Sequence, residues 1–122
     1  MKVLVVDDCD LMRIMILRDL KKMSAMECDQ AANGQEAVRA CQTNRYDLVL
    51  MDWNMPVMSG FEALRAIRAS GNKVPIIMVT TEAEKGRVIK ALKAGANNYV
   101  IKPFQAEALV SKIKLTLWKS HG

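Results

Sequence analysis

The strongest constraint on the fold is that short apolar runs alternate with longer amphipathic segments five times along the chain. Almost wholly apolar runs such as 48-LVLM-51 are typical of parallel strands that are covered on both faces. Alternation of such strands with helices predicts an α/β fold, in which a parallel sheet carries helices on both faces. The five predicted strands are 2-KVLVV-6, 28-CDQAA-32, 48-LVLMD-52, 75-PIIMVT-80 and 98-NYVIK-102.

Local signals place a helix after each strand. Asp10 is a suitable N-cap for the first helix, and Ser59 with Glu62 forms a capping-box sequence that opens the third. Gly71 and Gly95 are suitable C-terminal stops for the third and fourth helices. Because the alternation fills nearly the whole chain, we expect a single domain, residues 1–122. The predicted helices cover residues 11–23, 34–42, 60–69, 84–94 and 106–118.

Composition excludes some classes of protein. No apolar run approaches the roughly 20 residues that span a bilayer, so we expect no membrane insertion. Cys9, Cys28 and Cys41 are an odd number of cysteines without ligand-like spacing. This pattern indicates reduced thiols in a cytoplasmic protein.

Charge is distributed unevenly along the chain. Residues 1–83 hold 10 Lys and Arg against 11 Asp and Glu, a net charge of −1, whereas residues 84–122 hold 8 against 2, a net charge of +6. A basic C-terminal third is compatible with binding to nucleic acid, anionic lipid or an acidic protein. Charge alone leaves these three alternatives open, beside a basic surface that serves only solubility.

Polar side chains gather where the predicted strands end. Asp7 and Asp8 follow the first strand, and Asp52 ends the third. Thr80 ends the fourth strand and Lys102 the fifth. In an open α/β sheet, ligands bind beyond the carboxyl ends of the strands, which lie along one rim. We therefore expect three carboxylates, a hydroxyl and an ammonium group to share one site.

Such a site requires a cation. Two carboxylates about 4 Å apart repel by roughly 4 kcal/mol at an effective dielectric constant near 20. Lys102 balances only one of the three carboxylates, which leaves a formal charge of −2. An all-oxygen, water-rich site of this charge suits Mg²⁺. Mg²⁺, a hydroxyl and an ammonium group together favour phosphoryl transfer, with Asp52 as the nucleophile because it leaves the central strand.

The motifs at these positions resemble those of response-regulator receiver domains. They are the acidic pair Asp7-Asp8, 52-DWNMP-56, 80-TTEA-83 and 99-YVIKPF-104, and together they cover essentially the whole chain. Within the family, the single-domain chemotaxis receivers are the most similar. The resemblance implies a flavodoxin-like, doubly wound sheet of five parallel strands in the order 2-1-3-4-5, with five helices. Asp10 and Thr81 depart from the chemotaxis pattern, and the sequence assigns them no role beyond helix capping for Asp10.

The resemblance implies a phosphoacceptor and a metal site. A partner histidine kinase would pass its phosphoryl group to Asp52. Thr80 and Lys102 would each hold one oxygen of that group. The ligands of Mg²⁺ would be Asp7, Asp8, Asp52 and the backbone carbonyl of Asn54.

The resemblance also implies a switch. Thr80 would move towards the phosphoryl group, and Tyr99 would swing from an exposed to a buried position. These movements would remodel the face formed by residues 84–94, 98–102 and 106–118. Asn54 and Glu82 would flank the route of the water that hydrolyses the acyl phosphate. The Lys102–Pro103 peptide bond would be cis.

Partners follow from the resemblance and the charge together. We expect a histidine kinase of the CheA type upstream. Because the basic residues after residue 83 fall on the switching face, we expect an acidic protein downstream, such as a flagellar motor switch component or a phosphatase. We expect no nucleic-acid partner and a monomeric state. We also expect a signalling receiver that catalyses only its own phosphorylation and dephosphorylation, and no enzyme in the usual sense.

Four alternatives remain beside the interpretation as a messenger. A receiver of this size can also be a phosphorelay intermediate or a phosphate sink. A Mg²⁺-dependent phosphatase of the haloacid dehalogenase type also uses a nucleophilic Asp, but it needs an acid two residues later, where this chain has Asn54. A flavodoxin-like electron carrier would bind a flavin phosphate after the first strand, where Asp7 and Asp8 would repel it.

Overall fold

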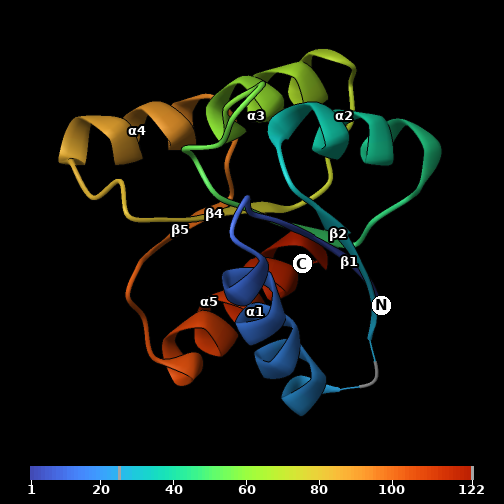
Figure 1. Cartoon of the computed structure of the whole chain (residues 1–122), viewed down its shortest axis with the longest axis vertical. Helices are drawn as coiled ribbons and strands as arrows, with labels where there is room; N and C mark the ends of the chain where they lie inside the picture. The colour runs from blue at the N-terminus through green and yellow to red at the C-terminus, as the bar shows by residue number, and fades with distance from the viewer. Residues whose placement is uncertain (25, 122) are drawn as a thin grey trace.

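The computed structural model describes residues 1–24 and 26–121 and contains five strands and five helices in strict alternation (Figure 1). The predicted domain, residues 1–122, therefore includes two positions, 25 and 122, that lie outside the described residues. The elements are β1 (Lys2–Val6), α1 (Asp10–Met23), β2 (Glu27–Ala31), α2 (Gly34–Thr43), β3 (Leu48–Met51), α3 (Gly60–Ala69), β4 (Ile76–Thr80), α4 (Lys85–Lys93), β5 (Asn98–Ile101) and α5 (Ala106–His121).

The five strands form one parallel sheet in the order β2-β1-β3-β4-β5. This confirms the predicted α/β class and the strand order that the family resemblance implied. The strands begin and end within one residue of their predicted bounds. Strand β2 is the least apolar, and its position at the edge of the sheet explains why Glu27 is exposed and Asp29 is only half-buried.

Helices cover both faces of the sheet (Figure 1). Helices α1 and α5 pack on one face, against side chains such as Val5, Leu50 and Val79. Helices α2, α3 and α4 pack on the other face, where Val6 and Met51 lie. The side chains of β1, β3 and β4 alternate between these two cores, because successive residues of a strand point to opposite faces. The three central strands are buried throughout, apart from the half-buried Lys2 at the start of β1.

Helix ends agree with the predicted signals in most places. Ser59 and Glu62 form the complete capping box, and the side chain of Asn33 accepts a hydrogen bond from the backbone N–H of Glu36 at the start of α2. The prediction that Asp10 is an N-cap is wrong, because α1 begins at Asp10 and Cys9 is its N-cap residue. The carboxylate of Asp10 pairs instead with the guanidinium of Arg13, which lies in the same helix. The turn before the helix is held by Asp7, whose carboxylate oxygen accepts a hydrogen bond from the backbone N–H of Cys9 at 2.9 Å.

Candidate functional site

The predicted acidic residues meet at the carboxyl ends of β1 and β3. Asp7 directly follows β1 and is 1% exposed, and Asp52 directly follows β3 and is 8% exposed. Asp8 is exposed beside them. One carboxylate oxygen from each of the three lies within 4.8 Å of the other two. The structure therefore brings all three predicted acids into one cluster, which we call the acidic cluster.

Lys102, at the end of β5, reaches into the acidic cluster. Its Nζ lies 2.6 Å from Oδ2 of Asp7 and 3.3 Å from Oδ2 of Asp52. Burial by itself would lower the pKa of Lys102, but the hydrogen bond to Asp7 and the charge of Asp52 outweigh burial and raise that pKa. The ammonium group is therefore charged at neutral pH. The Lys102–Pro103 bond is cis, as the resemblance implied.

The two buried carboxylates are oriented by their own loops. The second oxygen of Asp7 accepts the hydrogen bond from Cys9, and Oδ1 of Asp52 accepts one from the backbone N–H of Trp53 at 2.7 Å. Each acid thus has one oxygen held by the backbone and the other directed at Lys102. Asp8 is the exposed member of the cluster, so the cluster is open to solvent on its side.

The loop between β3 and α3 folds tightly against Asp52. The backbone N–H of Gly60 donates to the carbonyl of Trp53 at 2.8 Å. A Cβ atom at Gly60 would lie 1.7 Å from the backbone carbonyl oxygen of Asp52, so only glycine fits there. Val57, at the exposed tip, has a φ of 69°, which is rare for a β-branched residue. The loop therefore returns closely to the backbone of Asp52 and Trp53.

The predicted switch residues are linked through Glu82, which lies in the loop between β4 and α4. Thr80 is fully buried, and its Oγ1 accepts a hydrogen bond from the backbone N–H of Glu82 at 3.3 Å. Tyr99, on β5, is 5% exposed, and its hydroxyl donates to the backbone carbonyl of Glu82 at 2.6 Å. Burial, and then the nearby charge of Glu82, raise the pKa of Tyr99 to about 12. The resemblance implied an exposed and a buried position for the ring of Tyr99, and in this structure the ring is buried.

The two residues predicted to flank the hydrolytic water are in direct contact. Nδ2 of Asn54 donates to Oε1 of Glu82 at 2.7 Å. Asn54 comes two residues after Asp52, and Glu82 two residues after Thr80. Their hydrogen bond, which we call the Asn54–Glu82 bridge, joins the loops that follow two neighbouring strands.

Sequence reasoning missed the contacts that surround Trp53. Its ring is 4% exposed and stacks on Phe61 of α3, with centroids 4.9 Å apart and an angle of 9° between the planes. Two cations of α4 cover these rings: the guanidinium of Arg87 lies 5.3 Å from the Trp53 centroid, and the ammonium of Lys90 lies 4.7 Å from the Phe61 centroid. The only signal in the sequence is the basic character of residues 85–93, which we assigned to a partner surface.

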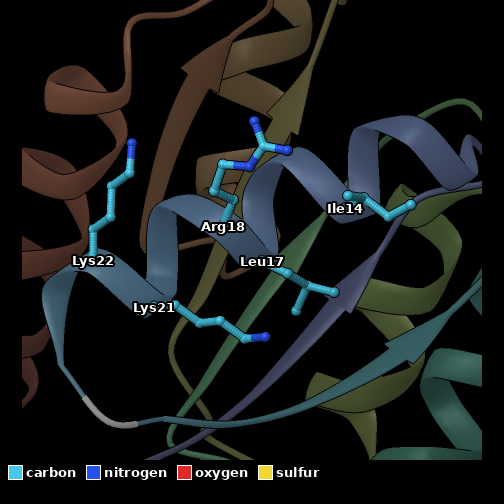
Figure 2. A pocket seen from close by; sticks show the side chains of 5 residues that line it. All are labelled: Ile14, Leu17, Arg18, Lys21 and Lys22. Atoms are coloured by element: carbon cyan, nitrogen blue, oxygen red, sulfur yellow. The ribbon is translucent and has the colours of Figure 1, made fainter.

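A surface hollow elsewhere on the molecule is no part of this site. It has a volume of about 540 Å³, and all five residues that line it belong to α1. Figure 2 shows the long side chains of Arg18, Lys21 and Lys22 extending from the second half of that helix. Its lining contains no carboxylate that could hold a metal ion, and the acidic cluster lies before the other end of α1.

Comparison with known proteins decides the family. The model of a family described as the response regulator receiver domain matches residues 3–114. The chain is a receiver domain. A chemotaxis protein CheY of Pseudomonas aeruginosa is 38% identical over the whole of both chains. A CheY homologue of Campylobacter jejuni is 43% identical over 100% of this chain and 96% of its own.

Solved structures agree with this assignment. The chemotaxis response regulator CheY4 of Vibrio cholerae has a TM-score of 0.86 and 36% identity, over 94% of this receiver and 97% of that chain. These matches confirm the predicted family and its chemotaxis branch. None of the described helices of this receiver is long and apolar enough to cross a membrane.

Proposed function

We propose that this receiver accepts a phosphoryl group on Asp52 from a phosphohistidine of a partner kinase, with Mg²⁺, and that phosphorylation changes the face formed by α4, β5 and α5. The observation that carries the proposal is the acidic cluster: Asp52 is held among carboxylates, and among residues 1–24 and 26–121 only Lys102 forms a salt bridge to its buried acids. CheY relatives of full length support a signalling role. The three free cysteines are consistent with a cytoplasmic location.

The donor set fits Mg²⁺. Three carboxylates offer oxygens no more than 4.8 Å apart, and one ammonium group leaves a formal charge of −2, which a divalent cation would neutralise. Bound Mg²⁺ supplies positive charge that stabilises the oxygens of a transferring phosphoryl group. The residues that would hold it are Asp7, Asp8, Asp52 and the backbone carbonyl of Asn54.

The protein's own residues supply the rest of the transfer. A carboxylate oxygen of Asp52 forms the new bond to phosphorus, and the bond from phosphorus to the histidine nitrogen breaks with its electron pair remaining on nitrogen. Lys102 already lies beside Asp52 and would hold one phosphoryl oxygen. The hydroxyl of Thr80 would turn from the backbone N–H of Glu82 to hold another.

The altered face would bind an acidic partner. Lys85, Lys93, Lys114 and Lys119 are exposed on α4 and α5. Three other basic residues have partners inside the protein: Arg87 and Lys90 lie over aromatic rings, and Lys112 donates to the backbone carbonyl of Tyr99. Large apolar side chains are also exposed on α4, β5 and α5: Ile89, Leu92, Ile101, Leu115 and Trp118.

We propose a messenger between a CheA-type kinase and a flagellar motor switch component or phosphatase; a phosphorelay intermediate or a phosphate sink is the alternative. A pull-down with and without beryllofluoride, a phosphoryl mimic, separates these roles. A messenger captures a non-kinase protein only in the activated form, and the capture weakens with salt because the contact is electrostatic. Capture of a histidine phosphotransfer protein in either form would favour the relay.

We further propose that this receiver acts on itself and does not turn over external phosphate esters. A phosphatase of the haloacid dehalogenase type needs a proton-transferring acid at position 54, and the amide of Asn54 is engaged with Glu82. Hydrolysis of a series of phosphate esters, measured as released phosphate, should therefore stay at the uncatalysed rate. Turnover of any of them would favour the phosphatase.

The direct test is covalent. Purified protein incubated with Mg²⁺ and acetyl phosphate should gain an adduct of about 80 Da that survives acid and is lost in base, as expected for one acyl phosphate. Asp52→Ala should gain none, and EDTA should prevent the gain in the wild type. The proposal is wrong if the wild type gains no adduct, or if Asp52→Ala gains it equally.

A further inference from the structure

Glu82 is the point where the switch residues and the phosphoacceptor loop meet. Its backbone contacts Thr80 and Tyr99, and one carboxylate oxygen forms the Asn54–Glu82 bridge at 2.7 Å. A carboxylate on an exposed loop has several rotamers available, so holding it at Asn54 requires a further constraint. Arg87 supplies that constraint, because its Nε lies 3.9 Å from the other oxygen, Oε2.

Arg87 is also fixed from its other side. Its guanidinium lies 5.3 Å from the centroid of Trp53, the residue directly after Asp52, and the ring of Trp53 is itself locked by stacking on Phe61. A flat guanidinium over an indole is the best geometry for a cation–π contact. One residue of α4 is thus tied to the loops that follow both β3 and β4.

We propose that Arg87 is a positioning residue that holds the Asn54–Glu82 bridge in place, and thereby sets the lifetime of phosphorylated Asp52 and makes it depend on the position of α4. This rests on the proposed function, and it assigns to Arg87 a role different from partner binding. The side chain of Arg87 is 45% exposed, so its contacts are weak enough to be released when α4 moves.

The chemistry gives the direction of the effect. In hydrolysis, the oxygen of a water molecule bonds to phosphorus while the bond from phosphorus to the Asp52 oxygen breaks. The electron pair returns to the carboxylate, and a proton of the water passes to the released phosphate. The water must approach in line, from the side opposite the Asp52 oxygen. The bridge joins two exposed loops beyond Asp52 and Thr80, so it restricts that approach, and loosening it speeds hydrolysis.

The test compares phosphoryl lifetimes. Protein is phosphorylated with acetyl phosphate and Mg²⁺ and freed of the donor, and the decay of the adduct is followed by intact mass. Arg87→Gln should decay about three- to tenfold faster, the range expected for losing one exposed ion pair and one cation–π contact. Arg87→Lys keeps the charge but loses the flat guanidinium that lies over Trp53, so its decay should fall between those of the wild type and Arg87→Gln.

Two controls isolate the bridge. Lys90→Gln removes the same charge from the same helix but takes its cation from Phe61, so its lifetime should match the wild type. In a Glu82→Ala background there is no carboxylate for Arg87 to hold, so Arg87→Gln should cause no further change in the lifetime.

Tryptophan fluorescence gives a second readout. Trp118 is 76% exposed, and a Trp118→Phe background leaves Trp53 as the single fluorescent tryptophan. In the Trp118→Phe background, Arg87→Gln should change the Trp53 emission of the unphosphorylated protein, whereas Lys90→Gln should not.

The outcomes separate two kinds of failure. No adduct on the wild type would overturn the proposed function itself. An adduct on the wild type with an unchanged lifetime in Arg87→Gln would overturn only the role of Arg87. The role is also overturned if Arg87→Gln accelerates decay equally with and without Glu82, or if Lys90→Gln accelerates it as much.

Discussion

Asp52→Asn should make the protein more stable in metal-free buffer, although the substitution removes one of the two carboxylates that pair with Lys102. Asn has nearly the same shape as Asp and keeps an oxygen to accept the hydrogen bond from Trp53. Lys102 keeps its closer partner, Asp7, at 2.6 Å. The substitution therefore removes mainly the charge of Asp52.

The charges set the size of the effect. At an effective dielectric constant of 20, attraction to Lys102 across 3.3 Å is about 5 kcal/mol, and repulsion from each neighbouring acid within 4.8 Å is about 3.5 kcal/mol. Asp8 is exposed, so solvent screens its share to roughly half. The attractions and repulsions then nearly cancel. What remains is the cost of desolvating a carboxylate that is only 8% exposed. We therefore expect Asp52→Asn to raise the free energy of unfolding by about 2 kcal/mol.

Urea denaturation in EDTA and in excess Mg²⁺ measures this effect. The variant should be more stable in EDTA. In Mg²⁺ the stability of the wild type should rise more than that of the variant, because an ion that binds the folded state more tightly stabilises it more. Glu107→Gln, an exposed acid of α5, is the control and should show neither effect. If Asp52→Asn is less stable than the wild type in EDTA, the reasoning that the buried charge of Asp52 destabilises the metal-free protein is refuted.

Three further outcomes follow from the same geometry. Val57→Asn should raise the free energy of unfolding by about 1 kcal/mol because Asn tolerates positive φ, and a loss of stability would contradict the strain. Gly60→Ala should cost about 3 kcal/mol or more and impair phosphorylation, since its Cβ would overlap the Asp52 carbonyl, and wild-type phosphorylation would argue against the tight loop. Burial raises the pKa of Tyr99 to about 12, so its neutral phenol stabilises the fold fully below about pH 10, the unfolded pKa, and this contribution is lost as the pH rises from about 10 to 12. Tyr99→Phe should flatten this part of the pH dependence of urea denaturation, and an unchanged slope would indicate an exposed ring.

Much of the fold could be predicted because local and long-range signals agree. Strands β1, β3 and β4 are nearly continuous apolar runs, and their burial on both faces is what that pattern means. Strand β2 carries almost no strand propensity, and only its place in the alternation identified it. No local sequence pattern predicts the order of the strands in the sheet, and that order came from the family resemblance.

The site was predictable to the level of which residues meet, because the ends of parallel strands share a rim. The pairing of Lys102 with Asp7 could not be predicted, since it joins residues 95 positions apart and depends on the reach of one flexible side chain. The roles of Asp10 and Arg87 were missed for a similar reason. Asp10 lies inside α1, whose N-cap residue is Cys9, and the side chain of Arg87 contacts Trp53 and Glu82.

The weakness of one hydrogen bond limits how the proposed switch can work. Turning the hydroxyl of Thr80 from Glu82 to a phosphoryl oxygen exchanges a bond of 3.3 Å, worth about 1 kcal/mol, for a charge-assisted one worth about 1.5–3 kcal/mol. The surplus is at most about 2 kcal/mol, whereas a shift from 1:99 to 99:1 needs about 5.5 kcal/mol. Thr80 alone therefore cannot complete the switch, and the other charge-assisted contacts of the phosphoryl group, including the one from Lys102, must supply the difference. Thr80→Ala should accordingly weaken activation without abolishing it, whereas Lys102→Met should abolish it.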